Sequence, residues 1–188
     1  MVSMEDDPIA LVPSRYEEWR EQFERERDRV IDVLELHDLS ERVRRIEHVG
    51  STAVPGLSAK DIVDVDVVVE DGSVKEVARV LETELGGTRY DNTVGWNPVA
   101  REVDGQRFND HVFAVSDDGW KVSVVTAAVL RARPTLRDEY EQLKREHASE
   151  TDDLETYSRS KSAFIAELLA VAQEQEDFEF EFAIPTPR

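Results

Sequence analysis

The chain has 188 residues and no cysteine, and it carries 42 acidic against 23 basic residues, a formal net charge of −19. This length fits one domain with a full hydrophobic core, and the lack of cysteine excludes disulfides, thiol catalysis and cysteine-ligated zinc. No apolar run approaches the roughly 20 residues of a membrane span, and the first residues lack the basic and apolar regions of a signal peptide. We therefore expect a cytoplasmic protein without a membrane partner.

The acidity has a second feature, because only five of the basic residues are lysines. Self-repulsion of this size destabilises a compact state at low ionic strength, and molar salt screens it. Acid excess with scarce lysine is typical of an extreme halophile's cytoplasm, and the alternative is an ordinary acidic protein. Either surface argues against general binding of nucleic acid, which depends on neutralising phosphates.

The first half of the chain predicts alternating helices and strands. A capping box at 14–17 predicts the start of a long helix, whose core-facing stripe recurs at helical spacing. Residues 43–49 and 62–69 are predicted strands. A second capping box, Ser73 with Glu76, predicts a helix through Leu85 that stops at two glycines. The residues of the first stripe are Tyr16, Trp19, Phe23, Val30 and Leu34.

The next segment predicts a β-hairpin, because Asp104-Gly105 separates the strand-like runs 97–103 and 106–115. In the second arm His111 shares a face with Asn109, and Asp110 points to the other face. A lone histidine in a strand is often structural. Residues 121–125 are β-branched and fit either a strand or the start of a helix.

Two helices are predicted toward the C-terminus, at 135–147 and 151–173, each opened by a threonine cap. Lys161 falls on the buried stripe of the last helix, four residues after Tyr157. A lysine there either snorkels to water or binds an anion in a cleft. In the tail, 174–188, three phenylalanines alternate with glutamates, which predicts an edge strand or a dimer arm, the alternative being a frayed end.

Paired acids interrupt the second predicted strand. Asp64 and Asp66 are two residues apart, so their carboxylates share one face, in a run whose valines indicate burial on both faces. Buried like charges need a partner, and a divalent cation such as Mg²⁺ is the natural one. In the alternative, one acid faces solvent and the other caps a loop.

A Gly-Ser pair precedes these acids, and Gly50 and Ser51 offer backbone N–H groups and a hydroxyl to a phosphate. A Gly-Ser turn followed by Asp-hydrophobic-Asp on a strand resembles the signature of the nucleotidyltransferase superfamily. Residues 47–57, EHVGSTAVPGL, with Ala59-Lys60, resemble the GrpB family (UPF0157), which is placed in that superfamily. The resemblance covers about residues 8–172. Departures occur at 109–112, NDHV for His-Leu-His-Val, and at 126–131, TAAVLR for Phe-Arg-Asp-Tyr-Leu-Arg.

The resemblance implies one α/β (α+β) domain over 1–173, a nucleotidyltransferase-like mixed sheet flanked by helices with a helical C-terminal part, followed by the acidic aromatic tail 174–188. It implies Mg²⁺-dependent transfer of a nucleoside monophosphate to a small acceptor, with Asp64 and Asp66 on the metal. His111 would position the acceptor or act as its base. The alternatives are a non-catalytic module that binds a nucleotide or another phosphorylated small molecule, and an assembly role, such as a homodimer through the tail. Implied anion-binding residues are Gly50, Ser51, Lys60, Arg131 and Lys161.

Overall fold

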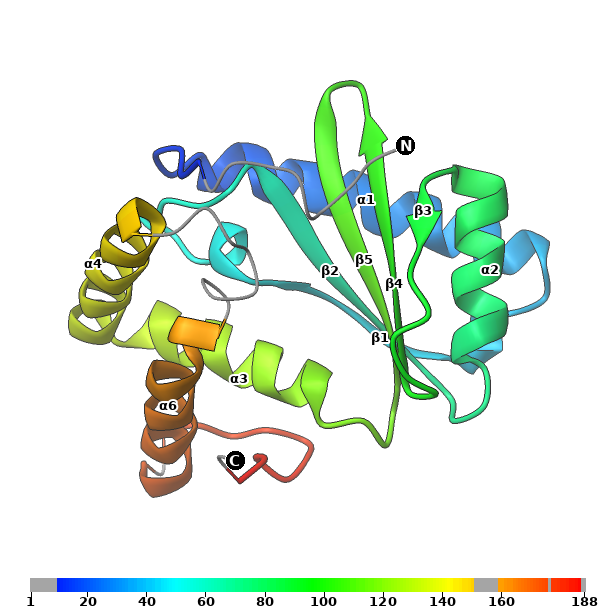
Figure 1. The fold of residues 1–188 in the computed structure, drawn as a ribbon. Coiled ribbons are helices and arrows are strands. Elements are labelled where there is room, and N and C mark those ends of the chain that lie inside the picture. The colour runs from blue at the N-terminus through cyan, green and yellow to red at the C-terminus, as the bar shows by residue number, and fades with distance from the viewer. Residues whose placement is uncertain (1–9, 151–158, 176, 187–188) are drawn as a thin grey trace.

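The computed structural model describes residues 10–150, 159–175 and 177–186 and is a mixed α/β fold (Figure 1). Five strands form one sheet, helices flank it, and the C-terminal part is helical, as the sequence predicts. No described helix has the length and apolarity needed to cross a membrane. In chain order the elements are α1 (Tyr16–Leu36), η1 (Ser40–Arg42), β1 (Val43–Val49), η2 (Ser51–Ala53), β2 (Ile62–Val69), α2 (Val74–Leu85), β3 (Thr88–Arg89), β4 (Trp96–Val103), β5 (Gln106–Ala114), α3 (Gly119–Ala132), α4 (Pro134–Glu150) and α6 (Ser162–Glu174).

The sheet places β2 between β1 and β5, in the order β1-β2-β5-β4-β3. The β2–β5 pair is parallel and the other pairs are antiparallel. The predicted hairpin of β4 and β5 turns at Asp104-Gly105. Because side chains alternate along a strand, the odd-numbered valines of β2 face α1 and α2 in the main core, while Val68 packs on the other side against Phe113 and Trp120.

The second core lies among the C-terminal helices. Val54 and Leu57, from the loop after β1, pack there against residues of α3, α4 and α6. Figure 1 shows these three helices gathered on the side of the sheet away from α2. The ambiguous segment 121–125 belongs to α3, where Val125 and Val129 lie four residues apart on the buried face, so the helical period decides its structure.

Both predicted capping boxes, at Ser14 and Ser73, are wrong, although the helices that they predicted, α1 and α2, are present. The Ser14 hydroxyl accepts the N–H of Gly56 (3.2 Å), and the Ser73 hydroxyl accepts a donor from Arg42 (3.2 Å). Neither hydroxyl makes a side-chain cap bond, because a tertiary partner takes it. The predicted threonine cap Thr135 is wrong, because α4 begins one residue earlier, at Pro134, a residue suited to a first helical position. The second predicted threonine cap, Thr151, lies outside the described residues.

The tail is neither an edge strand nor frayed over residues 177–186. It contains no strand there, and its phenylalanines pack on the cluster formed by α3, α4 and α6. Phe182 meets Trp120 edge-on at 4.7 Å between ring centroids. The apolar side chains of the tail therefore cover the chain's own helices. The homodimer stays a prediction.

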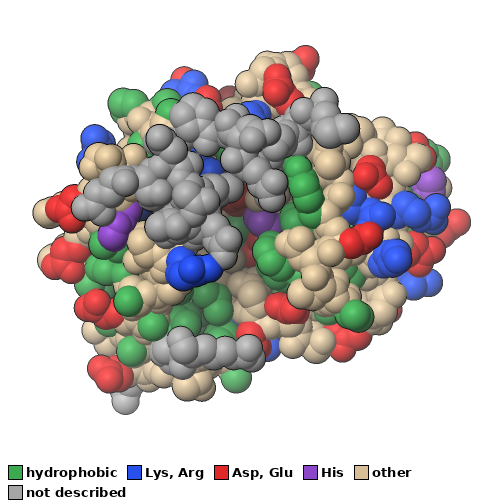
Figure 2. All heavy atoms as spheres, in the orientation of Figure 1, with side chains coloured by type: hydrophobic (Ala, Val, Ile, Leu, Met, Phe, Trp, Pro, Cys, Tyr) green, Lys and Arg blue, Asp and Glu red, His purple; other side chains and the backbone are tan. Residues whose placement is uncertain are grey.

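Acidic side chains are spread over the visible face of the molecule rather than gathered in one patch (Figure 2). Two acidic side chains lie instead in a buried charged cluster. There Arg101, on β4, binds Glu26 of α1 (2.8 Å) and Asp110 of β5 (3.4 Å). All three side chains are almost completely buried. Burial, followed by the negative charge of Glu26, raises the pKa of Asp110 well above its ordinary value.

Candidate functional site

The site lies on the face of β2 opposite α1 and α2. Asp64 and Asp66 both point there, because Val63, Val65 and Val67 occupy the other face. The strand register brings Asn109 and His111 of β5 beside them, pairing Asp64 with Asn109 and Asp66 with His111. From the other neighbour, β1, Glu47 pairs with Asp66. Sequence reasoning did not single out Glu47, because only the register shows its position.

Asp66 is fully buried, and among the residues that the structure describes neither of its carboxylate oxygens has a hydrogen-bond partner. Ser123 of α3 faces it, but its hydroxyl donates to the carbonyl of Gly119 in the same helix (3.2 Å). Burial raises the pKa of Asp66 to about 7, with His111 opposing the shift and Asp64 adding to it. A buried carboxylate without a donor is a group that a cation would satisfy.

Asp64 is one-third exposed and lies against Gly50. Gly50 has φ of +70°, and a Cβ placed on it would lie 2.5 Å from Oδ2 of Asp64. Glycine is therefore required here both by the backbone conformation and by the carboxylate next to it. This contact explains the Gly-Ser pair: it lets the turn at Ser51 approach the paired acids.

His111 is held by Trp96, a residue that sequence reasoning missed. The indole N–H of Trp96 donates to Nδ1 of His111 (3.1 Å), and since indole only donates, Nδ1 must be the acceptor. The proton of the neutral imidazole is then on Nε2, 3.5 Å from Asp64 Oδ1. The side-chain amide nitrogen of Asn109 lies 2.9 Å from the same Nε2, and because an amide nitrogen only donates, this amide has to turn its oxygen toward the ring to accept the Nε2 proton. In this tautomer His111 donates toward Asp64.

The same neighbours determine the pKa of the His111 imidazole. Burial lowers the pKa of His111, but the hydrogen bond to Asp64 and the negative charges of Asp66 and Asp64 outweigh it, so the pKa rises above its ordinary value. His48 behaves differently. It stacks on Phe23 of α1 and bonds Thr52 (3.0 Å), and burial, with the positive charge of Arg131, lowers its pKa to about 4.

Three of the five lysines of the chain belong to this region: Lys60 and Lys161 interact with the charge of Asp64, and Lys144 contacts Ser51. Burial lowers the pKa of Lys60, and the charge of Asp64 opposes this shift. Burial also lowers the pKa of Lys161 to about 8; Asp64 opposes the shift, whereas the positive charges of Lys60 and Lys144 add to it. Cations that crowd one another in a strongly acidic protein form a place for a multiply charged anion.

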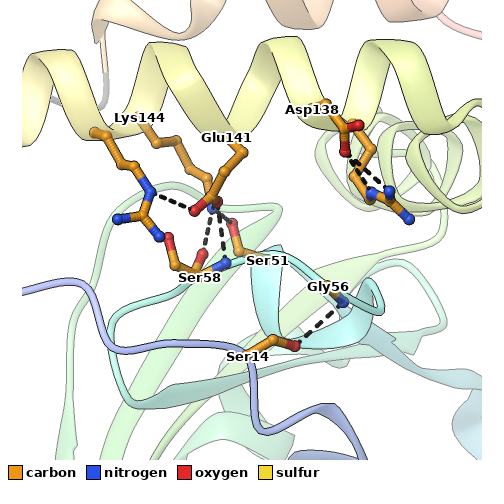
Figure 3. Close-up of polar contacts among 9 residues, drawn as sticks. Ser14, Ser51, Gly56, Ser58, Asp138, Glu141 and Lys144 are labelled. Carbon is orange, nitrogen blue, oxygen red and sulfur yellow. Dashed lines mark hydrogen bonds and ion pairs between the residues drawn. The ribbon is translucent and has the colours of Figure 1, made fainter.

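Lys144 was missed as a site residue. It extends from α4 to the Gly-Ser turn, where its ammonium donates to Ser51 Oγ (3.2 Å) and to the carbonyl oxygen of Ser58. Figure 3 shows Lys144 and Glu141 pointing from this helix toward the two serines. The signal available in the sequence was the scarcity of lysine, together with the match of Leu143-Lys144 to the family.

Arg131 binds the backbone of the loop. Its guanidinium donates to the carbonyl oxygens of Ala53 (2.7 Å) and His48 (3.4 Å), so α3 fixes both ends of the Gly-Ser turn through this side chain. Lys161 is the N-cap residue of α6 and does not lie on the buried stripe within that helix. Tyr157, four residues before it on the predicted stripe, lies outside the described residues.

Strand β5 itself supplies no third carboxylate to the site. Asp110, the only acid of β5, is on the opposite face and binds Arg101. Among the residues that the structure describes, no group of three histidines, cysteines or acids is arranged to hold a metal. Mg²⁺ commonly takes one or two protein carboxylates together with substrate phosphates and water, and Asp64 with the unpartnered Asp66 fits that donor set.

Comparisons with known proteins agree on one family. A family profile described as GrpB protein matches residues 8–171. The glutamate-rich protein GrpB of Alkalihalophilus pseudofirmus is 28% identical over 90% of this chain and 98% of its own length. A UPF0157 protein of Deinococcus radiodurans is 31% identical over 89% of this chain and 83% of its length. The crystal structure of conserved protein GrpB from Enterococcus faecalis superposes with a TM-score of 0.69 and 26% identity, covering 85% of this chain and 94% of that one.

Proposed function

The chain belongs to the GrpB family, and from that premise we propose that it binds a nucleoside triphosphate with Mg²⁺ and transfers the nucleoside monophosphate to a small acceptor. One observation carries the proposal: Asp64 and Asp66 share a face of β2, the charges of Lys60 and Lys161 act on Asp64, and Lys144 donates to Ser51 of the Gly-Ser turn. Carboxylates suited to a hard cation, beside cations suited to phosphates, are the two halves of a metal–nucleotide site.

In the proposed reaction, an acceptor oxygen forms a bond to the α-phosphorus, and the bond from that phosphorus to the bridging oxygen of the β-phosphate breaks. Pyrophosphate leaves, and the acceptor's proton passes to solvent. Bound Mg²⁺ would neutralise the charge that develops between the α- and β-phosphates. Asp64 and Asp66 would hold it through their carboxylate oxygens.

The other residues bind and orient. Ser51 and the backbone of its turn face the terminal phosphates, and Lys60 and Lys161 offset their charge. Arg131 keeps the turn in place through its bonds to Ala53 and His48. His111, with its proton on Nε2, orients Asp64. It is a positioning residue in this scheme.

A second candidate is a non-catalytic module that binds a nucleotide or another phosphorylated small molecule. The observation in its favour is the set of side chains that β5 supplies to the site. Asn109 and His111 lie beside the paired acids, whereas Asp110 is on the opposite face, in the buried ion cluster with Arg101. Because β5 supplies no carboxylate to this face, that strand offers no carboxylate general base for the acceptor. Binding without turnover would then be the function of the same residues.

The experiment that separates these functions combines binding with turnover in molar KCl. A thermal-shift screen of nucleotides with and without Mg²⁺ comes first, since ligand at a hundred times its dissociation constant adds about 2.7 kcal/mol of stability. Release of pyrophosphate from the best binder then measures transfer. Asp64→Asn should abolish Mg²⁺-dependent binding, and Asp32→Asn, on an exposed part of α1, is the matched control. Equal binding by wild type and Asp64→Asn would refute the metal role, and binding without pyrophosphate release would favour the second candidate.

A further inference from the structure

The ammonium group of Lys144 has three polar partners within the protein, two hydrogen-bond acceptors and one ion-pair partner. Its side chain is 1% exposed, and its partners are Ser51 Oγ (3.2 Å), the carbonyl oxygen of Ser58, and Glu141 Oε2 (3.5 Å). An ammonium group has three donors and no acceptor. The contact with Ser51 therefore has one direction: the lysine donates, and the serine oxygen accepts.

The orientation of the Ser51 hydroxyl follows from this. Because Oγ already accepts from Lys144, its own proton must point elsewhere, and no acceptor among the described residues takes it. Ser51 is only partly buried and follows Gly50, which touches Asp64. A donor with an open direction beside a cluster of lysines is suited to an anionic oxygen.

We propose that Lys144 is a positioning residue that turns the Ser51 hydroxyl into the site as a hydrogen-bond donor to a phosphoryl oxygen of a polyphosphate ligand. This inference rests on the proposed function and deepens it. Lys144 acts on the ligand through Ser51, in contrast to Lys60 and Lys161, whose charges lie nearer to Asp64.

Helix α4 holds the loop at a second point, and this fixes the distance between Lys144 and Ser51. Glu141, one turn before Lys144, accepts the backbone N–H of Ser58 through Oε2 (3.0 Å) and binds Arg145 through Oε1 (2.7 Å). Both backbone groups of Ser58 are thus bound by α4. Burial would raise the pKa of Glu141, but the hydrogen bonds from Ser58 and Arg145 outweigh it and lower the pKa, so Glu141 is ionised beside Lys144 at neutral pH.

The opposite arrangement, a neutral lysine acting as a base for a nucleophilic serine, does not fit these contacts. A neutral amine would have to accept from Ser51 while it remains next to a carbonyl oxygen and an ionised carboxylate, which are both acceptors. Burial lowers the pKa of Lys144 to about 8, which leaves it charged at pH 7. The contacts therefore keep the ammonium form in place.

A double-mutant cycle tests the proposal with inorganic tripolyphosphate as the probe, without Mg²⁺, by calorimetry at pH 7 in molar KCl. Ser51→Ala and Lys144→Met should each weaken binding about tenfold, the usual effect of losing a hydrogen bond to a charged group. The double variant should bind no more weakly than Ser51→Ala alone, because Lys144 acts through Ser51. Lys75→Met, at an exposed position of α2, removes a lysine charge elsewhere and controls for net charge. If Lys144→Met fails to fold, Lys144→Arg replaces it in the same cycle.

The outcomes separate this inference from the proposed function. A further loss of affinity when Lys144 is changed in the Ser51→Ala background would show direct contact with the ligand and overturn the inference alone. Unchanged binding by Ser51→Ala would overturn it in the same way. Wild-type protein that fails to bind tripolyphosphate would overturn this inference, whereas the proposed function, which requires Mg²⁺, is overturned only by failure in the thermal-shift screen with Mg²⁺.

Discussion

The indole N–H of Trp96 donates to Nδ1 of His111 at 3.1 Å, and this one bond sets the proton position on the histidine. The two rings also stack with Phe113 in one aromatic column. Because indole cannot accept, the ring nitrogen that faces the acids, Nε2, carries the proton. The residue that the sequence offers as a base is thereby converted into a donor toward Asp64.

Trp96→Phe should release this tautomer. The ring would still stack, but Nδ1 would lose its donor, so we expect a mixture of the two neutral tautomers in place of the Nε2–H form. The measurement is the ¹⁵N chemical shift pair of the His111 ring by NMR at a pH where the ring is neutral. Phe113→Leu is the matched control, since it removes a stacking ring and leaves the Trp96 bond. An unchanged tautomer in Trp96→Phe would contradict the assignment.

Asp66→Asn should stabilise the protein at alkaline pH in the absence of metal. The folded state raises the pKa of Asp66 from 3.8 to about 7, so the native state holds a proton that the unfolded state releases. The wild type therefore loses stability as pH rises from about 4 to about 7, and the loss is constant above that. The amide keeps the shape without the buried charge.

The expected gain of Asp66→Asn is on the order of a few kcal/mol at pH 8, small at pH 4. Urea unfolding in EDTA at several pH values measures it. Asp32→Asn, at an exposed position, should show no such widening. If the difference in free energy of unfolding between Asp66→Asn and wild type is the same at pH 4 and pH 8, burial does not raise the pKa of Asp66.

Sequence reasoning predicted four of the five strands of the described sheet, most helices and the shared face of Asp64 and Asp66, because strand alternation and the Gly-Ser and Asp-x-Asp patterns are local. It missed the two-residue strand β3, which is too short to show alternation. It missed contacts that depend on how distant elements pack. Lys144 meets Ser51 across 93 positions of the chain, and no periodicity encodes that distance. The two serine caps failed for the same reason: Ser14 and Ser73 each bond a partner far along the chain.

Phe182→Ala should destabilise the domain, because the tail packs on the core helices and contributes to their stability. Phe182 packs edge-on against Trp120 (4.7 Å) and lies under the guanidinium of Arg45 (5.6 Å to the centroid). Removing a half-buried ring of this kind should cost about 1–2 kcal/mol. Thermal melts measure the loss, and light scattering shows whether a dimer is involved. Glu179→Ala, exposed in the same tail, is the control, and an unaltered melt of Phe182→Ala would mean that the tail contributes nothing.

Salt should raise the melting temperature. The formal net charge is −19, and acidic side chains are spread over the face that Figure 2 shows. Their repulsion acts over the Debye length, about 10 Å at 0.1 M and 3 Å at 1 M salt. We expect the melting temperature to climb steeply between 0.1 and 1 M KCl and then to level off. The buried Glu26–Arg101–Asp110 cluster should not contribute, since buried pairs are screened much less. A melting temperature that does not respond to KCl would refute adaptation to high salt.

Gly50→Ala should damage the site more than its backbone conformation alone explains. Gly50 and Gly72 both have positive φ, +70° and +84°, so alanine strains either position. Only at Gly50 does the new Cβ meet a side chain, Asp64 Oδ2 at 2.5 Å, whereas nothing lies within 4 Å at Gly72. The shared strain should cost roughly 1–3 kcal/mol in both variants, measured by urea unfolding. The difference between them, together with loss of Mg²⁺-nucleotide binding in Gly50→Ala alone, measures the displacement of Asp64. Equal effects of the two substitutions would show that the contact with Asp64 does not position that carboxylate.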